Sequence, residues 1–172
     1  MAFIRWSEAM SVGVSRLDRD HKILIGLINR LDEASRRGDE APRVMAEVLG
    51  VLVDYTMFHF AREEAVMEAC GYPALGQHHE DHVALTREVQ EWRQRVEENA
   101  QAVAPLDVLD FLKGWLNHHI LLQDMAYRPY AAANPTADAA AEAYGLFDFS
   151  SADYAASEAE LENACGILVV NR

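Results

Sequence analysis

Four long segments of this chain repeat apolar residues at alternating spacings of three and four, the period of an amphipathic α-helix. Stretches that contain glycine or proline separate them, and such stretches end one helix or begin the next. Long amphipathic helices with short connections favour an all-α, up-down-up-down four-helix bundle. We expect the four helices at residues 18–37, 42–69, 74–99 and 106–127, with Arg128-Pro129 stopping the last.

Two further segments flank the expected helices. The residues before the first helix, with Trp6 and Gly13, predict an extended N-terminal arm that lies over the bundle. The chain after the last helix is rich in alanine and acidic residues. We therefore predict a bundle domain at 1–130 and a C-terminal extension of unknown role at 131–172.

The C-terminal extension contains two helix-start patterns. Asn134-Pro135 predicts a short helix, because asparagine caps helices and proline suits the first turn, and Ser151 predicts another. The sequence leaves open whether the extension is flexible or packs on the bundle.

Composition limits the partners and the compartment of the protein. A formal net charge of −13 argues against nucleic acids and anionic membranes as partners, since both repel an acidic surface. No apolar run approaches the roughly 20 residues of a transmembrane helix, and the first residues lack a signal-like layout. Cys70 and Cys165 favour free thiols in a reducing compartment, although a bridge between them stays open. We expect a cytoplasmic protein, of open oligomeric state.

Five histidines occupy positions on the inward faces of the expected helices that apolar residues otherwise hold. They are His21, His59, His78, His82 and His119. An unpartnered polar group in a core costs a few kcal/mol, so a single buried histidine is usually a hydrogen-bonded core residue. Five of them require a common explanation. On the last helix we expect the inward face to continue through Leu122 and Ala126.

The bundle topology brings these histidines to one level. The starts of the first and third helices lie beside the ends of the second and fourth, so the five histidines, Glu63 and Asp124 all fall within a slab about 15 Å thick. His59 and Glu63 are four residues apart and share a helix face. His119 and Asp124 are five apart, about 140° around an ideal helix, so we predict a π-bulge between them.

Seven such donors suit two octahedral metal ions bridged by both carboxylates. Structural zinc sites often use cysteine, and the cysteines of this chain are not on the inward faces. The HExxH motif and the Glu-x-x-His pairs of ferritin-like proteins are absent, and a nitrogen-rich set favours iron. Two carboxylates and one oxo or hydroxo bridge take three positions on each ion, so five histidines leave one position open for dioxygen. Apolar neighbours of the ligands predict an oxygen pocket, although they also suit plain core packing: Phe60, Trp115, Leu116 and Ile120.

The chain resembles the hemerythrins, specifically the bacterial single-domain bacteriohemerythrins, over roughly residues 3 to 130. The matching elements are Trp6, Gly13-Val14, Asp18-x-x-His21, His59-Phe60-x-x-Glu63-Glu64, Tyr72-Pro73, His78-x-x-x-His82 and Trp115-Leu116-x-x-His119-Ile120-x-x-x-Asp124. The resemblance implies a di-iron centre with an oxo or hydroxo bridge that binds dioxygen reversibly for storage, delivery or sensing, and a protein that is not an enzyme. It implies that one iron is held by His78, His82 and His119, that the iron with the open position is held by His21 and His59, and that Glu63 and Asp124 bridge them.

Two other functions stay open at this point. The same open position suits a di-iron oxidase or peroxidase, or an enzyme that handles nitric oxide. The unusual extension suits a signalling module that reports the state of the iron. Three neighbours of the ligands are expected to face solvent or to contact a ligand from outside: Glu64, His79 and His118.

Overall fold

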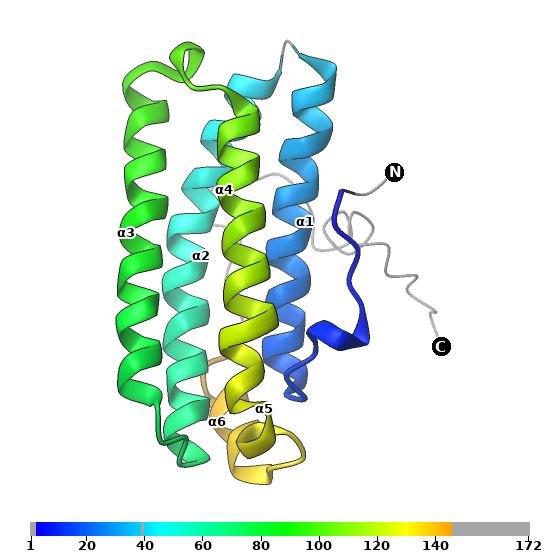
Figure 1. Cartoon of the computed structure of the whole chain (residues 1–172), viewed down its shortest axis with the longest axis vertical. Coiled ribbons are helices and arrows are strands. Elements are labelled where there is room, and N and C mark those ends of the chain that lie inside the picture. Colours follow the sequence, from blue (N-terminus) through cyan, green and yellow to red (C-terminus); the bar gives the residue numbers. More distant parts are fainter. Residues whose placement is uncertain (1–2, 39, 146–172) are drawn as a thin grey trace.

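The computed structural model describes residues 3–38 and 40–145, and within these ranges every regular element is a helix. Four long helices run up, down, up and down beside one another (Figure 1), which confirms the predicted bundle. They are α1 (Ser15–Arg37), α2 (Ala41–Ala69), α3 (Leu75–Asn99) and α4 (Pro105–His118). The shorter elements are η1 (Glu8–Met10), η2 (Ala100–Ala102), the π-helix η3 (His119–Asp124), α5 (Met125–Ala131) and α6 (Pro135–Ala143).

Local sequence explains where the long helices end and begin. Gly38 ends α1 with a φ of 85°, a left-handed conformation that glycine adopts without a steric penalty. Proline occupies the first turn of α2, α4 and α6, where its missing N–H has no partner to lose.

Helix α2 contains a long apolar stretch. Its most apolar window has a mean hydropathy of 1.4, so by length and composition it passes the test for a membrane span. The expectation that no such stretch exists was therefore wrong. However, 61% of that window is buried within the protein, as in a core helix of a bundle.

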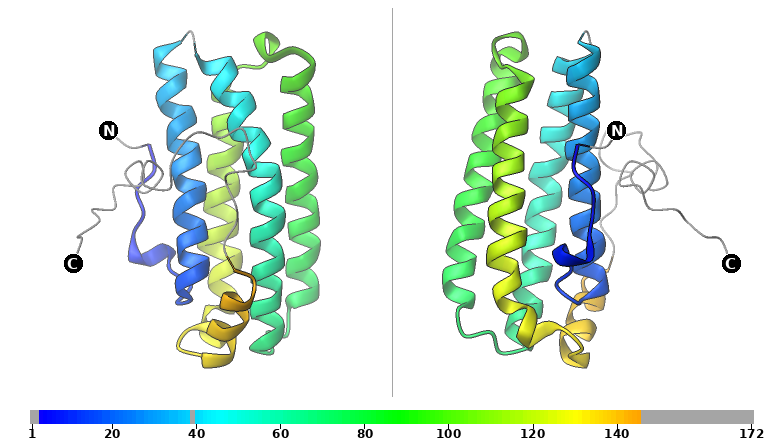
Figure 2. Two further views of the ribbon diagram at one scale, coloured as in Figure 1. Left: turned by 180° about the vertical axis from the view of Figure 1, so that it is seen from behind. Right: turned by 45° about the vertical axis from the view of Figure 1, so that its right-hand side comes forward.

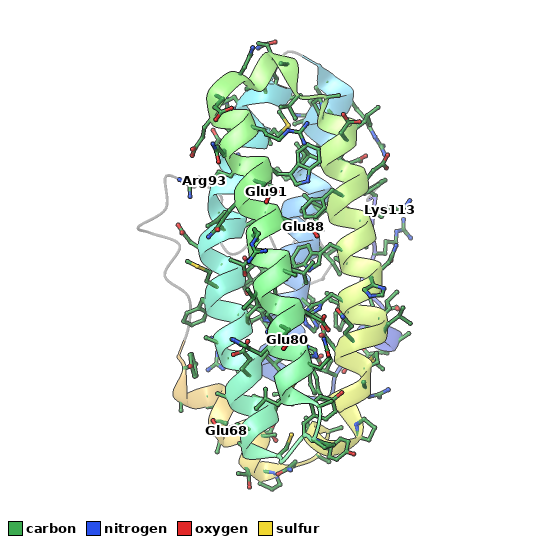
Figure 3. The ribbon with its side chains drawn as sticks, turned by 60° about the vertical axis from the view of Figure 1, so that its left-hand side comes forward. Glu68, Glu80, Glu88, Glu91, Arg93 and Lys113 are labelled. Carbon is green, nitrogen blue, oxygen red and sulfur yellow. The ribbon has the colours of Figure 1, made fainter. Side chains whose placement is uncertain are left out.

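Acidic side chains such as Glu80, Glu88 and Glu91 are exposed on α3 (Figure 3).

The N-terminal arm lies along α1 as predicted (Figure 1). Ile4 N–H donates to Asn29 Oδ1 at 2.8 Å, and Asn29 Nδ2 donates to Ile4 O at 2.8 Å. At the other end of the arm, Gly13 has a φ of 80°, and a Cβ there would lie 2.7 Å from Ala132 Cβ. Only glycine fits this contact, which joins the arm to the chain after α5.

The π-helix changes which residues of the last helix face inward. The pattern predicted Leu122 and Ala126 on the buried face, but Leu122 is 63% exposed and Ala126 is also exposed. A π-turn holds one more residue than an α-turn, so every later side chain rotates by about 100°. Asp124 and Tyr127 are buried in their place.

The chain after the π-helix, which includes α5 and α6, covers the end of the bundle where α2 and the π-helix end (Figure 1). Helix α5 passes through Pro129 and ends at Ala131, so the predicted stop at Arg128-Pro129 was wrong. Proline removes only its own N–H from the helix, and burial of Tyr127 and Ala131 supports the turn around it.

The predicted helix at Asn134-Pro135 is α6, which packs on α2 and α1 (Figure 2). Asn134 Oδ1 caps it by accepting from Thr136 N–H at 3.0 Å. This part of the extension is therefore packed on the bundle. The boundary at residue 130 stays a prediction, and the predictions for Ser151 and Cys165 concern positions outside the described residues.

Candidate metal centre

Seven polar side chains from four helical elements meet in the core at the end of the bundle above α5 and α6. Each is at most 4% exposed. They are His21 from α1, His59 and Glu63 from α2, His78 and His82 from α3, and His119 and Asp124 from the π-helix. All seven residues singled out in the sequence are thus brought to one place.

Glu63 lies at the centre of the cluster. Its Oε2 is 3.0 Å from Nε2 of His82, 3.6 Å from Nε2 of His78 and 3.8 Å from Nε2 of His119. The same oxygen is 3.9 Å from Nε2 of His59. One carboxylate therefore faces histidines on both sides of the core.

Asp124 spans the same two sides with separate oxygens. Oδ1 is 3.3 Å from Nε2 of His119 and 3.4 Å from Nε2 of His78, while Oδ2 is 3.4 Å from Nε2 of His21. The π-helix that begins at His119 and ends at Asp124 turns both side chains inward, so the predicted π-bulge is confirmed.

Six of the seven donors fall into two groups, each with its ligand atoms within 4.8 Å of one another. One group is Glu63, His78, His82 and His119, and the other is His21, His59 and Glu63. Glu63 is common to both groups. Two ions that share a carboxylate match this arrangement.

Several atoms of the cluster are buried without a hydrogen-bond partner, although burying a polar atom in this way is costly. They are both ring nitrogens of His21, Nε2 of His59 and of His78, and both oxygens of Asp124. In addition, Nε2 of His82 and Nε2 of His119 are 3.1 Å apart. Cations between these groups would satisfy the Nε2 atoms and both oxygens of Asp124, so the residues present fit two metal ions; Nδ1–H of His21 would still lack a partner.

Three histidines are oriented by side chains outside the cluster. In each, Nδ1–H donates outward, so the Nε2 lone pair faces the centre. The pairs are His59 with Asp20 Oδ2 at 3.2 Å, His82 with Glu64 Oε1 at 2.8 Å, and His119 with Gln123 Oε1 at 2.7 Å. Sequence reasoning missed Asp20 and Gln123. Their positions in the sequence could have suggested them, because Asp20 directly precedes the ligand His21 and Gln123 lies four residues after the ligand His119.

Two other side chains, Tyr127 and Asp81, contact the ligands or the residues that orient them. The buried Tyr127 hydroxyl donates to Glu63 Oε1. Gln123 Nε2 donates to Asp81 Oδ2 at 2.7 Å, which holds its amide in place. Sequence reasoning also missed Tyr127, because its side chain faces the core only after the extra residue of the π-helix has rotated the rest of the helix.

The carboxylates dominate the electrostatics of the cluster. Burial lowers the pKa of His78, but Asp124 and Glu63 beside it outweigh burial and raise that pKa to about 10. In the same way the pKa of His119 rises to about 9. Burial raises the pKa of Glu63, yet the surrounding histidines hold it well below its usual range. The two carboxylates are therefore anionic, and positive charge is favoured between them.

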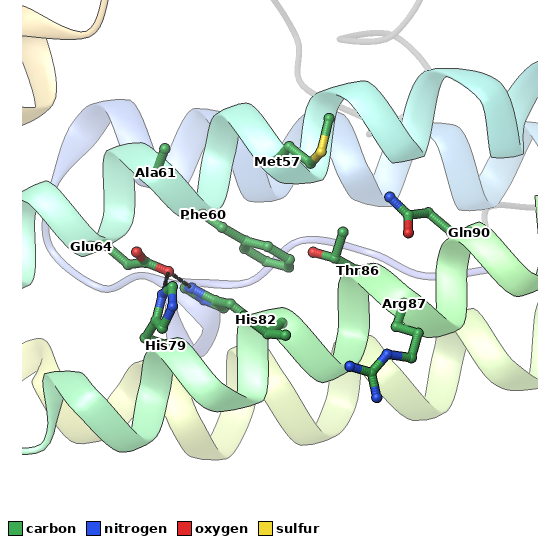
Figure 4. Close-up of a pocket in the computed structure, with 10 residues that line it drawn as sticks. Met57, Phe60, Ala61, Glu64, His79, His82, Thr86, Arg87 and Gln90 are labelled. Carbon is green, nitrogen blue, oxygen red and sulfur yellow. Dashed lines mark hydrogen bonds and ion pairs between the residues drawn. The ribbon is translucent and has the colours of Figure 1, made fainter.

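The four residues predicted to line an oxygen pocket are all buried in the main apolar cluster. The Phe60 ring stacks on the His82 ring, with centroids 3.9 Å apart and planes 9° apart. Phe60 and His82 also line a pocket of about 430 Å³ between α2 and α3 (Figure 4). Trp115, Leu116 and Ile120 lie on the α4 side of the core.

The remaining histidines lie outside the cluster. His79 has a side chain that is 58% exposed, with Nδ1 3.0 Å from Glu64 Oε1 (Figure 4). His118 is exposed on α4. Glu64 accepts from His82 and contacts His79, so it joins a buried ring to the surface.

Comparison with known proteins identifies the family. The hemerythrin HHE cation binding domain matches residues 12–131. A bacteriohemerythrin of Pseudomonas aeruginosa is 37% identical over 131 residues, covering 74% of this chain and 80% of that protein. One of Stenotrophomonas maltophilia is 33% identical over 134 residues, covering 78% and 85%. The crystal structure of a wild-type hemerythrin has a TM-score of 0.68 and 26% identity, covering 77% of this chain and 100% of that one. The chain therefore belongs to the hemerythrin family, whose domain binds a di-iron centre, and it is a di-iron, oxygen-binding protein.

Proposed function

We propose that this protein binds dioxygen reversibly, for storage, delivery or sensing, and that it is a carrier and not an enzyme. The proposal depends on one observation: seven buried donors, six of which form two groups that share the Glu63 carboxylate. We assign His78, His82 and His119 to one iron, His21 and His59 to the other, and Glu63 and Asp124 to both.

The number of donors supports an open position at one ion. The first group offers three imidazoles and the second offers two. If Glu63 and Asp124 are shared, they would add two donors to each ion, so the second ion would have one protein donor fewer than the first. When bound, the iron pair supplies this position together with the electrons that dioxygen binding requires.

The chain's own residues favour binding over further reaction. The ligands are fully buried, and Trp115, Leu116 and Ile120 are buried in the adjoining apolar core, so water and protons have little access. Asp20, Glu64 and Gln123 hold three rings in fixed tautomers, which keeps the donors aligned when a ligand binds or leaves.

The experiment is anaerobic loading with ferrous iron, followed by iron analysis and optical spectra under argon and air. We expect both iron ions to bind, a charge-transfer band to appear in air, and argon to remove it. A band that persists under argon would contradict reversible binding and favour the oxidase or peroxidase alternative.

Consecutive histidines provide matched controls for the ligand assignment. His119→Ala should lose iron, whereas His118→Ala, next to it on the surface, should keep it. The same contrast is expected between His78→Ala and His79→Ala. Equal iron content within either pair would refute the assignment of that ligand.

A further inference from the structure

Arg62 is a cation buried at the same end of the bundle as the metal centre. It lies on α2, three residues after His59, and its side chain is 1% exposed. Its Nη1 donates to both oxygens of Asp20 on α1, at 2.6 and 2.5 Å. A buried ion pair often contributes no more stability than apolar packing of the same volume, so this pair suggests a role beyond stability.

Asp20 connects Arg62 to a metal ligand. Its Oδ2 accepts from His59 Nδ1–H at 3.2 Å, and its Oδ1 accepts from the Tyr55 hydroxyl at 2.8 Å. Asp20 also directly precedes His21 in α1. A carboxylate on Nδ1–H makes an imidazole a stronger donor at Nε2, and a cation on that carboxylate weakens this effect. The charge of Arg62 therefore influences the ring of His59.

The other end of Arg62 is held by the C-terminal extension. Its Nη2 donates to the carbonyl oxygen of Gly145, which follows α6. Its guanidinium lies over the Phe58 ring at 4.7 Å, and the Tyr144 ring meets Phe58 edge-on at 6.2 Å. A segment distant in sequence thus closes over the buried ion pair.

Helix α6 holds this closure in place. Ala137 and Ala141 are buried against the bundle, and Glu142 accepts from Arg16 at 2.8 and 2.6 Å. Besides the Arg62–Gly145 hydrogen bond and the Phe58–Tyr144 ring contact, this interface consists of small buried alanines and one exposed ion pair, and an exposed ion pair contributes little free energy. Such a segment separates from its site at lower cost than a core helix does.

We propose that the C-terminal extension regulates the dioxygen affinity of the centre through the contacts Gly145–Arg62–Asp20–His59. This inference rests on the proposed function, although the contacts themselves belong to the chain alone. With α6 docked, Arg62 is held on Asp20 and compensates its charge. With α6 displaced, water reaches Arg62 and this compensation weakens. His59 then becomes the stronger donor, which lowers the reduction potential of the centre and raises dioxygen affinity.

The test compares two identical substitutions on α6 in the full chain. Ala141→Glu places a charge on the buried face and should displace the helix, whereas Ala139→Glu places it on the exposed face. We expect the dissociation constant for dioxygen to fall about fivefold in Ala141→Glu, the lower end of coupling between sites, and to stay unchanged in Ala139→Glu. Equal constants in both variants would overturn the proposal.

Two substitutions at the ion pair test the sign of the effect. Arg62→Met leaves Asp20 uncompensated and should increase dioxygen affinity and lower the reduction potential. The double variant Asp20→Asn with Arg62→Met has no buried charge, so it also guards against a failure to fold. It should change both quantities in the opposite direction, because a neutral amide accepts more weakly from His59. A shift of the same sign in both would overturn the relay, since a merely structural role predicts no reversal.

A readout on the metal-free chain separates this inference from the proposed function. Nitrogen NMR of the histidine rings reports the Nδ1–H of His59, and its resonance should move in Ala141→Glu but not in Ala139→Glu. Failure of the wild-type protein to bind dioxygen would refute the proposed function and leave this test intact. An unmoved His59 resonance in Ala141→Glu would refute the relay by itself.

Discussion

Replacing Tyr127 with phenylalanine removes one hydroxyl from the core and leaves the ring in place. In the native chain this hydroxyl donates to Glu63 Oε1, and both side chains are fully buried. Burial and the adjacent charge of Glu63 raise the pKa of Tyr127 well above its usual value, so the hydroxyl stays protonated and able to donate. The substitution therefore deprives an ionised, buried carboxylate of a hydrogen bond without creating a large cavity.

The expected cost follows from the charge of the acceptor. A hydrogen bond to a charged group contributes about 1.5–3 kcal/mol, and water cannot easily replace it at a buried site. For a chain of this size each kcal/mol lowers the melting temperature by about 2–4 °C. We therefore expect Tyr127→Phe to lower the melting temperature of the metal-free protein by about 3–12 °C.

Thermal unfolding of the metal-free protein, followed by circular dichroism, measures this change. Tyr130→Phe is the matched control, because Tyr130 lies three residues further along α5 and is 43% exposed. A surface change of this kind should stay within about 0.5 kcal/mol. Equal melting temperatures for the two variants would refute the account of Glu63 as an anion that needs the Tyr127 donor.

Three further predictions concern the metal and its ligands. Deleting Leu122 should convert the π-helix into α-helix, because His119 and Asp124 then lie four residues apart and share a helix face. We therefore expect metal analysis to find both iron ions still bound, and a loss of iron would contradict this. Gln123→Leu removes the acceptor for His119 Nδ1–H, so iron affinity measured against a competing chelator should fall about 10- to 100-fold, and an unchanged affinity would count against that contact. Removing iron should lower the free energy of unfolding by about 4 kcal/mol when free iron is about 1,000 times its dissociation constant, and identical urea midpoints with and without iron would disprove the linkage.

The bundle was predictable because helical periodicity is a local property. Apolar residues such as Leu24, Ile28 and Leu31 repeat at three and four, and the structure buries each of them. The clustering of the histidines followed from the same pattern with one added argument, that a core does not accept unpaired imidazole. Neither step required knowledge of how distant residues pair.

The side chains that orient the ligands depend on such pairing and, apart from Glu64, were missed. Asp20 and Arg62 are 42 residues apart, and each reads in sequence as an ordinary charged residue on a helix. Their burial follows from the way α1 and α2 meet and from α6 closing over them. The contact between Arg62 and Gly145 spans 83 residues and involves a backbone carbonyl, which carries no side-chain signal.

The last helix shows how a functional requirement changes a regular pattern. Simple periodicity turns Leu122 inward and Asp124 outward, which leaves the core apolar and removes a ligand. The structure does the reverse, at the cost of exposing a leucine and straining a helix. One extra residue in the turn delivers Asp124 to the centre and, three residues later, Tyr127 to Glu63. The sign of this widening in the sequence is the five-residue spacing of His119 and Asp124, and its mark in the structure is an exposed leucine near a buried aspartate.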